Sequence, residues 1–196
     1  LMKLSLSALS LGIAATLVAF PIDPLISQYM THTDGADGTI ALAQEQQSLD
    51  LTLTGHKREV RTNRQGLPEV VWLSLEGGLL KPPPRLQPGD VVRYTISGNN
   101  RTEQPIRGLV LNDDIPENMV IVLGTARVEN GTASITYSAD GGQSYSPSPM
   151  IRERRSDGTL VSRPAKPEEY THVRWTFTEP IPAKSSVGGS YQVRLQ

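Results

Sequence analysis

Two adjacent carboxylates, Asp113 and Asp114, are the first residues whose types and spacing could do chemistry. Paired carboxylates can act as acid and base in catalysis, or bind calcium through their oxygens. Neighbouring residues on a strand point to opposite faces of a sheet, which separates the two side chains. We therefore expect one Asp to organise the turn before Ile115-Pro116 through backbone hydrogen bonds, as Asp commonly does.

Calcium binding at this end of the domain is the weaker alternative, with Asp90 or Glu117 joining Asp113 and Asp114 as ligands. Residues 33–38, Thr-Asp-Gly-Ala-Asp-Gly, offer two more carboxylates that are three positions apart. A calcium loop needs ligands at alternating positions and a later bidentate Glu, so this spacing does not fit. Gly, Asp and Thr cluster in unstructured connections, and a flexible linker is expected here. The sequence thus predicts no metal and no cofactor.

Residues 138–145, Ser-Ala-Asp-Gly-Gly-Gln-Ser-Tyr, resemble the Asp-box of sialidase-like propellers, Ser-x-Asp-x-Gly-x-Thr-Trp. Ser144 and Tyr145 stand where the box has Thr and Trp. Those boxes are structural hairpins that lie away from the catalytic centre. A propeller needs several copies of its unit, and this chain has one such motif. We therefore expect a stable hairpin turn.

The histidines do not form a catalytic or zinc-binding pattern. His32, His56 and His172 lack the spacing of a zinc motif, and no G-x-S-x-G nucleophile elbow is present. Phosphate-loop and dinucleotide fingerprints are also missing from the sequence. We expect a protein that is not an enzyme, with His172 pointing outward from a strand.

Three arginines, Arg152, Arg154 and Arg155, could bind an acidic glycan or phosphate. They are mixed with Glu153 and Asp157, which favours a solvated loop instead.

The composition excludes several classes of protein. Cysteine is absent from the 196 residues, so disulfides, thiolate metal sites and a lipidated N-terminal cysteine are excluded. The net charge of −1 comes from 19 basic and 20 acidic residues, without the basic surface of a nucleic-acid-binding protein. The 17 Gly and 15 Pro favour many short strands joined by turns.

The N-terminus has the pattern of a secretory signal. Lys3 precedes an uncharged, mainly apolar run of 17 residues, 4–20, which Pro21 ends. A retained membrane anchor is the first alternative and a buried helix of the mature domain is the second. We expect residues 1–43 to be a signal or anchor helix plus a linker, with Ala-Leu-Ala at 41–43 as a cleavage site. The domain would then be exported to the periplasm, the cell surface or the medium, and only an uncleaved segment would contact the membrane.

The elements that must position these residues are strands. After the turn at Pro88-Gly89-Asp90, the apolar residues Val92, Tyr94 and Ile96 alternate with polar ones, which predicts a strand with one buried face. Trp175 and Phe177 alternate in the same way and complete the expected core. Further strands are expected at 49–54, 70–75, 106–112, 119–123, 127–129, 133–138, 150–152, 159–161 and 188–195.

Three local expectations concern how these strands are placed. The charged stretch 57–64 could extend the first strand along an edge. The continuous apolar run 119–123 is typical of a strand covered on both sides. Asn130-Gly131 is a strong hairpin signal that predicts residues 133–138 as the return strand.

With no helical pattern between the strands, the sequence predicts an all-β, largely antiparallel sandwich of Greek-key type. Residues 44–196 would form a single domain with a long insertion at about 124–170.

The segment 88–123 resembles a bacterial surface-protein repeat catalogued as domain of unknown function eleven. The resemblance rests on Pro-Gly-Asp at 88–90, on Asn100, on Leu-Asn-Asp-Asp-Ile-Pro at 111–116 and on Met-Val-Ile-Val at 119–122. It extends weakly over residues 48–196 and implies an immunoglobulin-like sandwich in an exported or cell-surface protein. The chain departs from the family in its single copy, in Ile115 where Leu is usual, and in its insertion, which is similar to forms found in cyanobacteria.

Together these observations predict an exported, non-enzymatic module with a structural or protein-interaction role in the cell envelope or outside the cell. Its partner would be another envelope protein or a surface polymer, bound through strand edges and exposed loops. The alternative is a carbohydrate-binding or calcium-dependent adhesive module. A hydrolase is disfavoured because the sequence presents no nucleophile and base.

Overall fold

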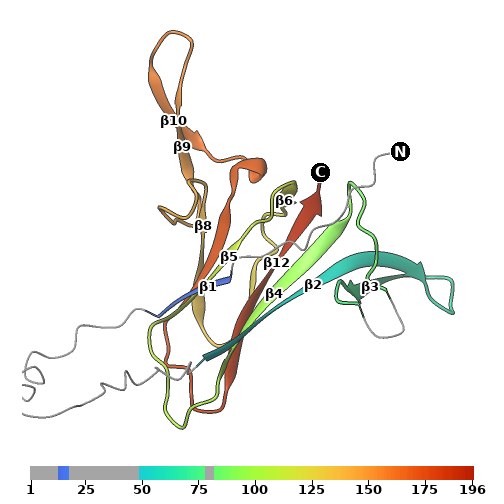
Figure 1. The fold of residues 1–196 in the computed structure, drawn as a ribbon. Helices are drawn as coiled ribbons and strands as arrows, with labels where there is room; N and C mark the ends of the chain where they lie inside the picture. Colours follow the sequence, from blue (N-terminus) through green and yellow to red (C-terminus); the bar gives the residue numbers. More distant parts are fainter. Residues whose placement is uncertain (1–12, 18–48, 78–81) are drawn as a thin grey trace, which may run out of the picture.

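The computed structural model describes residues 13–17, 49–77 and 82–196 (Figure 1). Within these residues the chain is all-β, with antiparallel sheets. The strands are β1 (Ile13–Leu17), β2 (Leu49–Thr62), β3 (Pro68–Ser74), β4 (Val91–Asn100), β5 (Leu109–Asp114), β6 (Met119–Ile121), β7 (Arg127–Asn130), β8 (Ala133–Ser138), β9 (Met150–Arg154), β10 (Leu160–Pro164), β11 (His172–Phe177) and β12 (Ser186–Leu195), with a short 3₁₀ helix, η2 (Pro167–Glu169).

The strands form two main sheets and one separate hairpin. One sheet has the order β1-β5-β11-β8, and the other has the order β3-β2-β4-β12-β6, with β7 also paired to β12. The hairpin consists of β9 and β10. The sheets face each other, since the rings of Trp175 on β11 and Tyr191 on β12 lie with centroids 6.0 Å apart. This is the layered antiparallel architecture of a β-sandwich.

The core lies between β4 and β12 on one side and β5 and β11 on the other. Alternation on β4 buries Val92, Tyr94 and Ile96, and alternation on β11 buries Trp175 and Phe177, as the sequence pattern predicts. The polar residues between them are less buried, so each strand turns one face to the core.

Trp175 is the largest buried side chain of the described core. Its Nε1–H donates to the carbonyl oxygen of Arg127 at 2.9 Å, which satisfies the one polar atom of the ring. The facing strand makes room for the ring with Gly189, where an added Cβ would lie 2.2 Å from Trp175 Cε2.

Asn100 joins two loops at one end of the sandwich. Its side chain is fully buried, and its Nδ2 donates to the carbonyl oxygens of Gln104, Ile181 and Pro182. Its Oδ1 accepts from the backbone N–H and the hydroxyl of Thr102. Asn100, the last residue of β4, therefore bridges two loops that are far apart in the chain.

The sequence predicts a hairpin at Asn130-Gly131, and the predicted pairing of its two strands is wrong. β7, before the turn, pairs with β12, whereas β8, after it, pairs with β11. The turn therefore carries the chain from one sheet to the other. Positive φ at Gly131 (86°) shows that the turn chemistry itself was identified correctly.

Two hairpins project from the sandwich (Figure 1). In the first hairpin, the charged second half of β2 extends beyond β4 and pairs with β3. The extension that the sequence predicts at an edge is therefore one strand of a two-stranded arm. The second is β9–β10, whose Arg163 is held by Glu153 at 2.7 Å and by Glu169 at 2.6 Å. Large apolar side chains are exposed on both arms, namely Val60, Leu67, Val70, Met150 and Leu160.

The N-terminal expectations fall largely outside the described residues. Within the apolar run, Ile13–Leu17 form β1, which pairs antiparallel with β5. The remainder of the expected signal or anchor helix, the linker and the cleavage site at 41–43 lie outside the described residues. No helix in the described part of the chain is long and apolar enough to span a bilayer.

Candidate functional site

The two adjacent carboxylates separate onto opposite faces of β5, as strand geometry requires. Asp113 points into the core and is fully buried, whereas the Asp114 side chain is about half exposed, at 52%. Neither oxygen of Asp113 has a hydrogen bond of good geometry among the described residues. The Tyr191 hydroxyl lies near this carboxyl but donates to the carbonyl oxygen of Asp114, at 3.3 Å. Asp113 therefore does not organise the turn through backbone hydrogen bonds, which is the role that the sequence predicts for one of the two residues.

The charge state of Asp113 depends on pH near neutrality. Burial raises the pKa of its carboxyl to about 7, with a further increase from the charge of Asp114. The nearby Tyr191 hydroxyl and Asp114 N–H lower this pKa and offset part of the increase. Burial and the Asp113 charge in turn raise the pKa of Tyr191 well above its ordinary value. Asp113 and Tyr191 thus form a pair of acidic groups that are both buried in the core.

Asp114 belongs to a polar cluster on the outer face of the four-stranded sheet. Its Oδ1 lies 2.9 Å from Nε2 of His172, and the ring of Tyr145 packs edge-on against His172. The guanidinium of Arg174 covers the Tyr145 ring at 3.3 Å from its centroid, and Arg174 Nε donates to Asn112. Because Arg174 already covers one face of Tyr145, this face of the ring is not a free platform for a sugar.

Asp90 supports a turn and does not join the other carboxylates. It pairs with Lys57 at 2.6 Å and accepts the backbone N–H of Gln87 at 2.7 Å. These bonds to Lys57 and Gln87 lower its pKa, overcoming the opposite effect of desolvation, which is the largest single contribution. Within the part of the chain that the structure describes, no group of three or more His, Asp or Glu could hold a metal ion.

The Asp-box-like segment forms a tight turn. Asp140 accepts hydrogen bonds from the Ser138 and Ser144 hydroxyls and from the backbone of Gln143 and Ser144. The bond from Ser138 contributes most to lowering the pKa of Asp140 far below its usual range. A Tyr137–Ser146 bridge closes the turn, which is the hairpin that the motif predicts.

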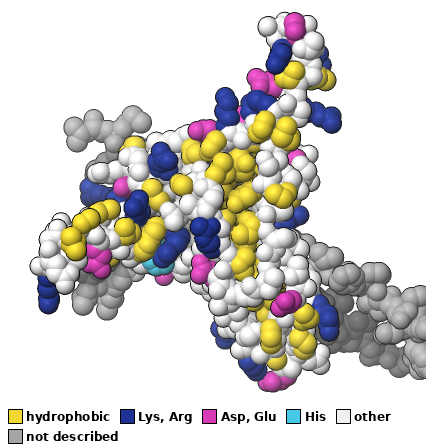
Figure 2. Space-filling view, turned by 180° about the vertical axis from the view of Figure 1, so that it is seen from behind, with side chains coloured by type: hydrophobic (Ala, Val, Ile, Leu, Met, Phe, Trp, Pro, Cys, Tyr) yellow, Lys and Arg dark blue, Asp and Glu magenta, His cyan; other side chains and the backbone are white. Residues whose placement is uncertain are grey.

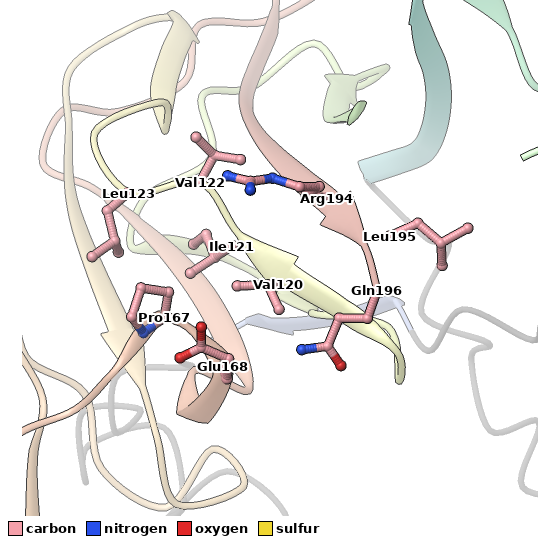
Figure 3. Close-up of a pocket in the computed structure, with 9 residues that line it drawn as sticks. All are labelled: Val120, Ile121, Val122, Leu123, Pro167, Glu168, Arg194, Leu195 and Gln196. Atoms are coloured by element: carbon pink, nitrogen blue, oxygen red, sulfur yellow. The ribbon is translucent and has the colours of Figure 1, made fainter. Parts of the chain in front are cut away.

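A cleft of about 440 Å³ lies beside β6, between this strand and η2 (Figure 3). Figure 3 shows Pro167 and Glu168 of η2 on one side of it. Its lining is mainly apolar, with one carboxylate and one guanidinium, and consists of Val120, Ile121, Val122, Leu123, Pro167, Glu168, Arg194, Leu195 and Gln196.

The cleft lies at the edge of the sheet, where residues of β6 and residues at the end of the neighbouring β12 line it together. Four consecutive residues, 120–123, line it, although neighbours on a strand point to opposite faces. β6 pairs with β12, and just beyond it the N–H of Val122 donates to Gln192 at 2.8 Å. Backbone groups alternate between the two sides of a strand, so Ile121 turns its N–H and C=O away from β12. Within the described residues no strand pairs with that side of β6.

The exposure of the run 119–123 differs from what its apolar sequence predicts. Ile121 is buried, but Leu123 is 47% exposed and the strand ends after three residues. A continuous apolar run is typical of a strand covered on both sides, yet here part of the run is exposed at an edge. Nothing in the sequence of this run separates these two cases.

We found no family model, no curated protein and no solved structure that matches this chain.

Proposed function

We propose that this chain is an exported, non-enzymatic interaction module that binds an extended apolar segment of a partner protein in the cleft beside β6. The observation that carries the proposal is the apolar cleft along an unpaired strand edge. An extended peptide can add to such an edge through main-chain hydrogen bonds, while alternate side chains enter the cleft. Such a module needs no reactive residue.

Two further features support an interaction role. Figure 2 shows hydrophobic side chains exposed in a band over the body between the two projecting hairpins. Contiguous apolar surface on a soluble domain commonly marks an interaction site. The sequence resemblance to a bacterial surface-protein repeat and the signal-like N-terminus agree with a partner in the envelope or outside the cell. We extend the proposal to an immunoglobulin-like, Greek-key arrangement of the two sheets.

Carbohydrate or calcium-dependent adhesion remains the alternative function. A sugar site commonly offers exposed aromatic rings in a groove, but the cleft beside β6 has no aromatic residue in its lining. A glycan array probed with and without calcium tests this alternative directly. Reproducible glycan binding that survives substitution in the cleft would favour it over peptide binding.

We expect Leu123→Glu to weaken peptide binding with little loss of stability. Selection of a random 12-residue peptide library on the protein should enrich extended apolar sequences, and one of them, labelled with fluorescein, serves as the probe. The new glutamate would lie beside apolar groups in the cleft, so the labelled peptide should bind at least about tenfold more weakly, or ~1.4 kcal/mol. Because Leu123 is 47% exposed, the free energy of unfolding should change little.

Leu67→Glu is the matched control, since Leu67 is a 59% exposed leucine in the turn between β2 and β3, away from the cleft lining. It should leave the affinity unchanged, and hydrogen exchange should show that the probe protects residues 119–123. The proposal fails if no apolar peptide is enriched, or if both variants weaken binding equally.

A further inference from the structure

In the four-stranded sheet, the edge of β5 is covered by a short strand from near the N-terminus, β1. Five residues of β1 pair antiparallel with β5, in the register Ile13 to Asp113 through Leu17 to Leu109. β1 occupies an outer position of its sheet, so β5 has β11 on one side and this short strand on the other. An apolar, uncharged segment therefore fills an edge that would otherwise be open.

The segment that fills this edge is separate from the rest of the domain in sequence. More than thirty residues lie between β1 and β2 in the chain, so no short turn fixes β1 on the sheet. Its main contacts with the described elements are made to β5. A strand attached in this way can leave the edge without unfolding the sheets, whose other pairs do not involve it.

The edge itself favours an apolar strand. On β5, Leu109 and Leu111 are fully or almost fully buried at the core side of the sheet. In the facing sheet, Leu49, Leu51 and Leu53 of β2 pack against the core but are only partly buried. An uncovered β5 edge would also leave backbone donors and acceptors unpaired beside this apolar interior, which costs free energy.

We propose that the β5 edge is a strand-acceptor site for an extended apolar segment of a partner protein, and that Ile13–Leu17 occupies it in cis. Main-chain pairing supplies the affinity, and the lack of charge in the strand supplies the selectivity. Departure of β1 from the edge, by cleavage or by insertion in a membrane, would open the site. This site does not depend on the cleft beside β6, because the two edges belong to different sheets.

The test compares two variants of the full chain. Ala14→Pro with Thr16→Pro removes two backbone donors from β1 and blocks its pairing. Ala14→Ser with Thr16→Ser keeps both donors and serves as the matched control. Hydrogen exchange should show amides of residues 109–114 exchanging at least about tenfold faster in the proline variant than in the serine variant.

The probe is a fluorescein-labelled peptide with the sequence of residues 11–20, flanked by lysines for solubility. It should bind the proline variant and restore protection at residues 109–114, and it should bind the serine variant at least tenfold more weakly because the edge is filled. The same peptide with Asp in place of Ala15 should not bind, since Ala15 pairs with the buried Leu111.

Equal protection of residues 109–114 in both variants would overturn the cis assignment. Loss of protection that the peptide does not restore would overturn the acceptor site. Adding Leu123→Glu to the proline variant should leave binding of this peptide unchanged, so failure of this proposal and failure of the cleft can be told apart.

Discussion

Replacing Trp175 by alanine is expected to lower the free energy of unfolding by about 3–5 kcal/mol. The ring is fully buried between the sheets, so its loss leaves a large cavity among side chains such as Tyr191. The substitution also leaves the carbonyl oxygen of Arg127 without the indole N–H, at a cost of its own. Because a domain of this kind is stable by only about 5–15 kcal/mol, much of the protein should be unfolded under mild denaturant. Chemical denaturation followed by circular dichroism measures the loss.

Gly189→Ala examines the same contact from the opposite sheet. Its new Cβ would lie 2.2 Å from Trp175 Cε2, a distance that atoms do not tolerate, so strand or ring must move. We expect a loss of about 3 kcal/mol or more, at the upper end of overpacking effects. In a Trp175→Phe background the smaller ring should relieve part of the clash, so the two substitutions should not be additive.

Gly98→Ala is the control for glycine in a strand of the same sheet. There the new Cβ would meet the flexible end of Leu49 at 3.3 Å, and the expected change is within about 1 kcal/mol. If Gly189→Ala is as mild as Gly98→Ala, the close packing of Trp175 on β12 is not present in solution.

Features set by a few neighbouring residues could be predicted from the sequence. Alternation along 170–178 identifies Trp175 and Phe177 as inward residues, because side chains on a strand alternate with period two. Asn130-Gly131 predicts a turn because glycine readily adopts a positive φ, and Gly131 has a φ of 86°. The sheet that the next strand joins depends on distant partners, so the predicted hairpin pairing was wrong.

The candidate sites depend on such distant partners and could not be predicted. Nothing in the run 119–123 indicates that η2, more than forty residues later, forms the other side of a cleft. Similarly, alternation separates Asp113 from Asp114 but does not say which one faces the core. Turn chemistry suggested a solvated carboxyl, whereas Asp113 is the buried one.

Asp113→Asn is expected to stabilise the protein at alkaline pH by about 4 kcal/mol, with little effect at pH 4. Burial raises the folded-state pKa of Asp113 to about 7, above its ordinary value of 3.8. The folded state therefore binds the proton more tightly than the unfolded state does. The stabilising contribution of the protonated carboxyl is complete below about pH 4 and is lost as the pH rises through about 7. Asparagine has nearly the same shape and no charge, so its contribution does not titrate.

The measurement is the difference between the unfolding free energies of the variant and the original chain from pH 4 to 8. Taking this difference cancels the contributions of carboxyls whose pKa is lowered in the folded state, because both proteins contain them. One such group is Glu169, with a pKa of about 2, whose contribution to stability is lost as the pH falls. The difference should rise between pH 4 and 7 and then level off. Asp114→Asn is the control: its carboxyl is 52% exposed and pairs with His172 at the surface, where such a pair contributes about 0–1 kcal/mol. A difference curve for Asp113→Asn that stays flat would mean that water or a protein group reaches this carboxyl in the folded state and stabilises its charge.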